Sequence, residues 1–173
     1  MNPIVGLVGP SGSGKTTLIE AMVARFPERV GILKSLTTRA RRGPEDDVNY
    51  DFVSVEEMRA REKAGRLVQV SAYAGNLYAH DRDHCNGLLE EKIGICALVE
   101  QGVRNLRNAG YEVIVVGIVP ENWPGERDAA RAQADKQRAA SGLEPDYTIT
   151  NSFEPGGLTR AEDALAERIS RIV

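Results

Sequence analysis

The sequence predicts an α/β fold, in which a parallel sheet is covered by helices and a small mixed lobe is inserted into the chain. Three observations support this prediction. Short apolar runs alternate with amphipathic stretches over much of the chain, as in folds whose parallel strands are joined by helical crossovers. The first apolar run ends in a glycine-rich segment that leads into a helix pattern. Residues 35–82 interrupt the alternation with short strands and turn signals.

Length and composition are those of a globular chain with one structural domain. Hydrophobic residues make up 42% and charged residues 27% of the 173 residues, and the net charge is −3. A chain of this size buries about 70% of the surface that it exposes when unfolded, so its stability needs neither a disulfide nor a metal. The slightly acidic balance argues against a nucleic-acid coat protein or a basic membrane binder.

Nothing in the sequence has the pattern of a targeting or membrane segment. The apolar run Ile4–Val8 is far shorter than a signal-peptide core or the roughly 20 residues that cross a bilayer. Two cysteines, Cys85 and Cys96, are too few for a disulfide scaffold and fit a reducing compartment. We therefore expect a soluble cytoplasmic protein, whose oligomeric state the sequence leaves open.

Hydrophobic periodicity predicts most elements of the core. Ile4–Val8 is nearly all apolar, as in a strand buried on both faces. Lys15–Arg25 carries its apolar side chains on one side of a helix. The remaining core strands are expected at residues 95–99, 113–119 and 147–150, with a helix at 103–109.

Two further helices are predicted near the end of the chain. One runs from Pro124, because proline is favourable in a first turn, to Ser141, which precedes Gly142. The other closes the chain, and Thr159 and Glu162 form a capping-box pattern for its start.

Residues 35–82 have the signals of a small mixed lobe. Ser54 and Glu57 form a capping-box pattern for a short helix. The expected strands are 50–53, 67–73 and 77–79, with a tight turn at 74–76. We therefore divide the chain into a core of residues 1–34 and 83–173 and an inserted lobe of residues 35–82.

The segment from Gly9 to Thr16 matches the phosphate-loop pattern G-x-x-x-x-G-K-[ST], between a buried strand and a helix. Its backbone N–H groups and the helix N-terminus can hold phosphates, Lys15 can reach the terminal phosphates, and Thr16 can ligate magnesium. The core is therefore predicted to be a three-layer P-loop NTPase fold that binds ATP and Mg²⁺. The candidate ATP-binding residues are Gly9, Ser11, Gly12, Ser13, Gly14, Lys15, Thr16 and Thr17.

A second set of motifs follows the phosphate loop. Residues 37–43 read T-T-R-A-R-R-G, residues 49–54 read N-Y-D-F-V-S, and residues 74–78 read A-G-N-L-Y. In this order and spacing they resemble the monophosphate-binding lobe of guanylate kinases; the likeness extends to about residue 110 and resumes more weakly at 146–151. An arginine-lined phosphate site facing the first is what an enzyme needs to hold an acceptor in line with a triphosphate donor.

The resemblance implies roles for individual residues. Arg39 and Arg42 would bind the acceptor phosphate, and the hydroxyl groups of Tyr50 and Tyr78 would complete its cradle. Ser35 stands where the family contacts the acceptor base. Arg41 is expected to face solvent.

The chain departs from the family where the base is read. Gln69 and His80 line up with a glutamate and a small hydroxyl residue, and the Asp-x-Asp pair that ends a core strand is replaced by Ala97-Leu98-Val99. Gln69 and His80 therefore count as candidate acceptor-binding residues. Glu100 could supply the lost carboxylate to a metal shell, or it could be an exposed residue of a helix's first turn.

The arginine-rich lid of the family is shortened here, at about residues 120–135. Arg127 and Arg131, four residues apart, are the candidates for a catalytic lid arginine, which would neutralise charge on the transferring phosphoryl group. Arg138 is a weaker candidate. Trp123 could stack on the donor adenine or anchor a loop.

Together these patterns predict an ATP- and Mg²⁺-dependent phosphotransferase that moves the γ-phosphate of ATP to a nucleoside monophosphate, GMP or a related nucleotide. Its partners would be small nucleotides, not nucleic acid or membrane. Two alternatives stay open. One is a phosphosugar kinase of the same superfamily, acting on a compound such as ribose bisphosphate. The other is a non-catalytic guanylate kinase-like interaction module, although such modules typically have degraded phosphate loops.

Overall fold

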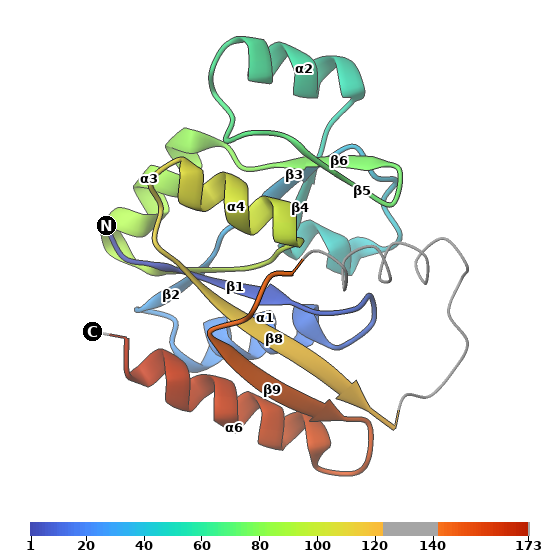
Figure 1. Cartoon of the computed structure of the whole chain (residues 1–173), viewed down its shortest axis with the longest axis vertical. Helices are drawn as coiled ribbons and strands as arrows, with labels where there is room; N and C mark the ends of the chain where they lie inside the picture. Colours follow the sequence, from blue (N-terminus) through green and yellow to red (C-terminus); the bar gives the residue numbers. More distant parts are fainter. Residues whose placement is uncertain (123–141, 173) are drawn as a thin grey trace.

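The computed structural model describes residues 1–122 and 142–172 (Figure 1). The helix expected at 124–141 and most of the expected lid lie outside these residues. So do Trp123, Arg127, Arg131 and Arg138. No helix among the described residues combines the length and the hydropathy needed to cross a membrane.

Five parallel strands form the core sheet, in the order β2-β7-β1-β8-β9. Sequence periodicity predicted this parallel α/β arrangement, and the structure confirms it. All five residues of the central strand β1 are buried, which explains why its sequence is a continuous apolar run. The strands are β1 (Ile4–Val8), β2 (Val30–Ile32), β7 (Ile93–Ala97), β8 (Val113–Glu121) and β9 (Tyr147–Ser152).

Helices cover both faces of this sheet and make three layers (Figure 1). Helices α1 (Lys15–Arg25) and α6 (Gly157–Ser170) pack on one face in an apolar cluster that contains Val5 and Leu7 of β1. Helices α3 (Arg82–Glu91) and α4 (Glu100–Asn108) pack on the other face, in a cluster that contains Ile4 and Val8. Alternate residues of β1 thus serve opposite layers, as the two-residue repeat of a strand requires.

A second sheet of four strands lies beside the core, in the order β4-β3-β6-β5 (Figure 1). A short 3₁₀ helix, η1 (Pro44–Val48), and helix α2 (Val55–Lys63) accompany it. Leu36, Met58, Leu67 and Ala79 form a separate small apolar cluster here. The strands are β3 (Ser35–Thr37), β4 (Tyr50–Phe52), β5 (Ser71–Tyr73) and β6 (Asn76–Ala79).

Local chemistry explains two of the element boundaries in this sheet. The Ser54 hydroxyl accepts a hydrogen bond from the Glu57 N–H at 3.0 Å, which confirms the predicted start of α2. The β5–β6 hairpin turns through Ala74 and Gly75, both with positive φ.

The prediction for the start of the closing helix was wrong. Helix α6 begins at Gly157 after the N-cap residue Gly156, so Thr159 lies inside the first turn. A Cβ atom on Gly157 would lie 1.9 Å from the Ser152 carbonyl oxygen. The close approach of β9 to the helix therefore requires glycine here, and this long-range contact fixes the boundary.

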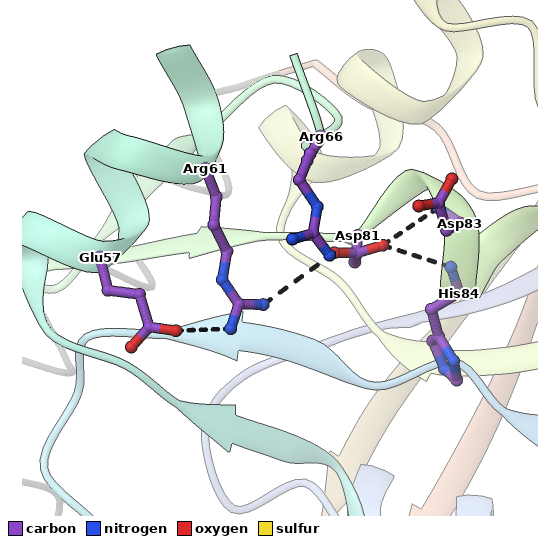
Figure 2. A network of polar contacts seen from close by, with 6 residues as sticks. All are labelled: Glu57, Arg61, Arg66, Asp81, Asp83 and His84. Atoms are coloured by element: carbon purple, nitrogen blue, oxygen red, sulfur yellow. Dashed lines mark hydrogen bonds and ion pairs between the residues drawn. The ribbon is translucent and has the colours of Figure 1, made fainter. Parts of the chain in front are cut away.

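Helix α3, which periodicity did not predict, starts at a polar network (Figure 2). The Asp81 carboxylate accepts hydrogen bonds from the backbone N–H groups of Asp83 and His84, which caps the helix. Arg66 approaches the same carboxylate to 3.4 Å and Arg61, on α2, to 4.0 Å. This network joins α2 to the first core helix after the small sheet.

Candidate active site

The phosphate loop connects β1 to α1 and is held in a tight curve. Gly12 and Gly14 have φ values of 81° and 91°, a region that side chains other than glycine rarely adopt. A Cβ atom on Gly14 would lie 2.4 Å from the Asn151 Nδ2 atom. Asn151, buried on β9, donates from this nitrogen to the Ser13 carbonyl at 2.9 Å. The loop is therefore clamped from the neighbouring strand.

Lys15 and Thr16 follow directly as the first residues of α1, whose N-cap Gly14 offers no side-chain hydrogen bond. The Lys15 ammonium donates to the carbonyl oxygens of Gly9 and Pro10 at 2.7 and 2.8 Å. The helix N-terminus and this ammonium make the loop a positive, donor-rich surface, which suits phosphate oxygens.

A buried arginine, Arg39, follows strand β3 of the small sheet. The Arg39 guanidinium donates to the Asp46 carboxylate at 2.9 Å and lies over the rings of Tyr50 and Phe52, with its carbon 4.9 and 5.6 Å from their centroids. Only 8% of the Arg39 side chain is exposed. Asp46 also accepts from the Arg42 backbone N–H at 2.8 Å. Its carboxylate thus fixes both the side chain of Arg39 and the backbone of Arg42.

The charge state of this pair follows from its contacts. The hydrogen bond from Arg39 lowers the pKa of Asp46, although burial opposes the shift. Burial also raises the pKa of the Tyr50 phenol. At neutral pH the site therefore holds an ion pair beside a neutral tyrosine. Arg41, by contrast, is exposed and pairs with Asp47.

One cavity of about 380 Å³ joins the phosphate loop to the arginine cluster. All seven candidate acceptor residues line it, as do seven of the eight candidate ATP-binding residues. Ser13 is the exception, because its side chain is fully buried beneath the loop. The predicted residues on the cavity wall are Gly9, Ser11, Gly12, Gly14, Lys15, Thr16, Thr17, Ser35, Arg39, Arg42, Tyr50, Gln69, Tyr78 and His80.

Apart from the phosphate loop and the arginine cluster with its paired carboxylate, the described cavity wall consists of neutral polar and apolar residues. The Ser35 hydroxyl and the His80 Nε2 atom, both buried, lie 3.1 Å apart. Burial lowers the pKa of His80 to about 4, so the ring is neutral at pH 7. The Gln69 backbone carbonyl accepts from the side chain of Asn105 on α4 at 2.9 Å. Ala97 and Val99, where the family has aspartates, also line the cavity.

Sequence reasoning missed several residues of this site. Asp46, Ser71, Tyr73 and Asn105 line the cavity, and Asn151 clamps the phosphate loop. Asp46 lies only four residues after Arg42 in an acidic loop. This short distance in sequence was the one signal that Asp46 could pair with the arginine cluster. Asn105 and Asn151 act on partners 36 and 138 residues away, and no local pattern marks them.

The donors present suit a magnesium ion that arrives with its nucleotide. Thr16 lines the cavity, while the described residues contain no cluster of three or more His, Cys, Asp or Glu side chains that could hold a metal. Glu100 was the candidate for a carboxylate near the metal. It is the half-buried first residue of α4 and is not on the cavity wall. In phosphate-loop enzymes, a Ser or Thr hydroxyl and the substrate phosphates are among the ligands of magnesium.

Comparison with known proteins gives a consistent result. The family model for guanylate kinase matches residues 1–144. The chain is 31% identical to guanylate kinase from Streptomyces coelicolor over 84% of this chain and 81% of that protein. It is 29% identical to guanylate kinase from Sus scrofa, over 98% and 94% of the two chains. Guanylate kinase 1 from Arabidopsis thaliana is 32% identical, and this chain spans about a third of its length.

A solved structure supports the fold independently. Guanylate kinase from Anaplasma phagocytophilum superposes with a TM-score of 0.71 over 98% of this chain and 85% of that one, at 22% sequence identity. The matching fold, the family model and the relatives together show that this chain belongs to the guanylate kinase family of P-loop nucleoside monophosphate kinases.

Proposed function

We propose that this protein transfers the γ-phosphate of ATP to a nucleoside monophosphate, GMP or a related nucleotide. The observation that carries the proposal is a shared cavity of about 380 Å³, which is lined both by the phosphate loop and by Arg39 and Arg42. Two phosphate sites that share a cavity can hold donor and acceptor in line, which supplies much of the catalysis in phosphoryl transfer.

On the donor side, the backbone N–H groups of the loop bind the phosphates of ATP, and Lys15 stabilises charge on the transferring group. Thr16 would hold the magnesium ion of the nucleotide, which would neutralise charge on the β- and γ-phosphates. The lid arginines Arg127 and Arg131 remain candidates for further charge stabilisation.

On the acceptor side, Arg39 and Arg42 bind the monophosphate, and Tyr50 and Tyr78 donate hydrogen bonds to it. Asp46 orients the guanidinium of Arg39 through its 2.9 Å hydrogen bond. An oxygen of the bound monophosphate attacks the γ-phosphorus, the bond from that phosphorus to the bridging oxygen breaks, and ADP leaves.

The test is ADP release by the purified protein with ATP, Mg²⁺ and a panel of nucleoside monophosphates and phosphosugars. We expect release that depends on a nucleoside monophosphate. Turnover with a phosphosugar alone would support the phosphosugar kinase, and no acceptor-dependent release at all would support the interaction module. Either result would overturn the proposal.

A further inference from the structure

On the part of the cavity wall that the structure describes, no carboxylate is available to a base. Among the described residues on the cavity wall, Asp46 is the single acidic one, and it is held by Arg39 and by the Arg42 backbone. Apart from the phosphate loop with the start of α1, the arginine cluster and the tyrosines, the polar residues on the described wall are Ser35, Gln69, Ser71, His80 and Asn105. A base in this space therefore meets neutral hydrogen-bonding groups.

Ser35 and His80 can each act as donor or acceptor. They form a buried pair at 3.1 Å, and the low pKa of His80 keeps its ring neutral. A neutral imidazole has one N–H donor and one nitrogen acceptor, and a hydroxyl can rotate to donate or to accept. This pair can therefore adapt to a carbonyl or to an amino group on a base.

Gln69 can also donate or accept hydrogen bonds, and its backbone is fixed by a hydrogen bond from α4. The Gln69 backbone carbonyl accepts a hydrogen bond from the Asn105 side chain, whose oxygen accepts from Gln101 at 2.8 Å. Gln69 itself is exposed and lines the cavity. An amide presents one donor beside one acceptor, and a rotation of the terminal torsion exchanges them. It can therefore pair with a 6-oxopurine, through N1–H and O6, or with a 6-aminopurine, through N1 and the 6-amino group.

The hydrogen-bond donors of guanine are poorly matched by these neutral groups. Its N1–H and 2-amino group are adjacent donors, which a carboxylate can accept together with charge assistance. An amide satisfies one of the two and presents a donor to the other. The 2-amino group therefore contributes little to the binding of guanine in this pocket.

We propose that the acceptor site reads its base through neutral groups that can donate or accept, and that it uses purine monophosphates without regard to the 2-amino group. GMP, IMP and AMP are then all acceptors. This inference rests on the proposed function and specifies its substrate class.

The experiment measures kcat/KM for GMP, IMP and AMP with the full chain, ATP and Mg²⁺. GMP and IMP differ only in the 2-amino group, so their ratio isolates its contribution. We expect the three values to agree within about tenfold, whereas a site built to bind a substrate polar group rejects the analogue without it by about 10⁴-fold. A GMP preference over IMP or AMP above a hundredfold would overturn the inference and leave the kinase function standing.

Substitution supplies a second test. Gln69→Glu introduces the missing carboxylate and should raise the GMP-to-IMP ratio by about tenfold or more. Asn108→Asp is the matched control, because it adds the same charge at the exposed end of α4, outside the cavity wall, and should leave the ratio unchanged. An unchanged ratio in Gln69→Glu, or an equal rise in Asn108→Asp, contradicts the assignment of Gln69. No turnover of wild type with any monophosphate would instead refute the proposed function.

Discussion

Arg42 and Arg41 are neighbours in the chain but have different surroundings. Both are exposed, but Arg42 lines the cavity and its backbone N–H is fixed by Asp46, whereas Arg41 is outside the cavity wall and pairs with Asp47. Arg42→Ala should raise the KM for the acceptor by about 10- to 100-fold, because charge-assisted hydrogen bonds to its phosphate are lost. The KM for ATP should stay unchanged. Steady-state kinetics with each substrate varied in turn measure both.

Arg41→Ala is the matched control and should change neither KM. If Arg42→Ala weakened ATP instead and spared the acceptor, the arginine cluster would belong to the other phosphate site.

His80 gives the stability of the protein a predictable dependence on pH. Its pKa is about 4 in the folded state because of burial, against 6.5 when exposed, so between these values the unfolded chain binds a proton that the folded chain does not. Stability from this residue is present above pH 6.5 and is lost as the pH falls toward 4. Linkage then predicts a loss of about 2 kcal/mol in unfolding free energy between pH 7 and pH 5. Urea denaturation at the two pH values measures it.

His80→Gln should lose less stability over this interval than wild type. His84→Gln, at an exposed residue whose charge makes only the smaller contribution to the low pKa of His80, should lose nearly as much stability as wild type. Equal losses in wild type and His80→Gln would show that His80 is not the group that takes up the proton.

At the scale of elements, the phosphate loop depends on Gly14. Its φ of 91° and the 2.4 Å approach to Asn151 leave no room for a methyl group. Gly14→Ala should therefore cost about 1–3 kcal/mol of stability and weaken ATP binding. Thermal denaturation and titration with ATP measure the two effects.

Gly87 offers the opposite case within α3. Apart from its chain neighbours and the backbone of its own helix, no atom lies within 4 Å of the position that its Cβ would take. Gly87→Ala should therefore stabilise the protein by about 0.5–1 kcal/mol. If Gly14→Ala instead kept wild-type stability and ATP affinity, the phosphate loop would not require glycine at position 14.

Elements with strong local signals were predictable, and those set by distant contacts were not. Strand β1 and helix α1 agree with the predicted bounds, since a buried apolar run and a phosphate-loop motif define them. Strand β7 lies two residues earlier than expected, at Ile93–Ala97. The three-residue strands β2 and β3 are too short to show periodicity. Their place is set by pairing with β7 and with β4 and β6.

At the scale of the whole molecule, the site also combines residues that local motifs predict with residues that only distant contacts bring into place. Sequence motifs predicted candidate phosphate-binding residues, and the fold brings the described ones, except Ser13, to one cavity. The groups that orient them come from elsewhere. Asn105 reaches Gln69 across 36 residues and Asn151 reaches Ser13 across 138. Such contacts depend on the packing of sheet and helix, which one sequence does not display.

The most direct test of the central claim follows the phosphate itself. ATP labelled in the γ-phosphate is incubated with the protein, Mg²⁺ and a nucleoside monophosphate, and the labelled products are separated. We predict that the label appears in the nucleoside diphosphate. The rate should be orders of magnitude lower in Lys15→Ala, because Lys15 acts on charge that develops during transfer. Label that appears only as inorganic phosphate, or an equal rate in Lys15→Ala, would contradict this prediction.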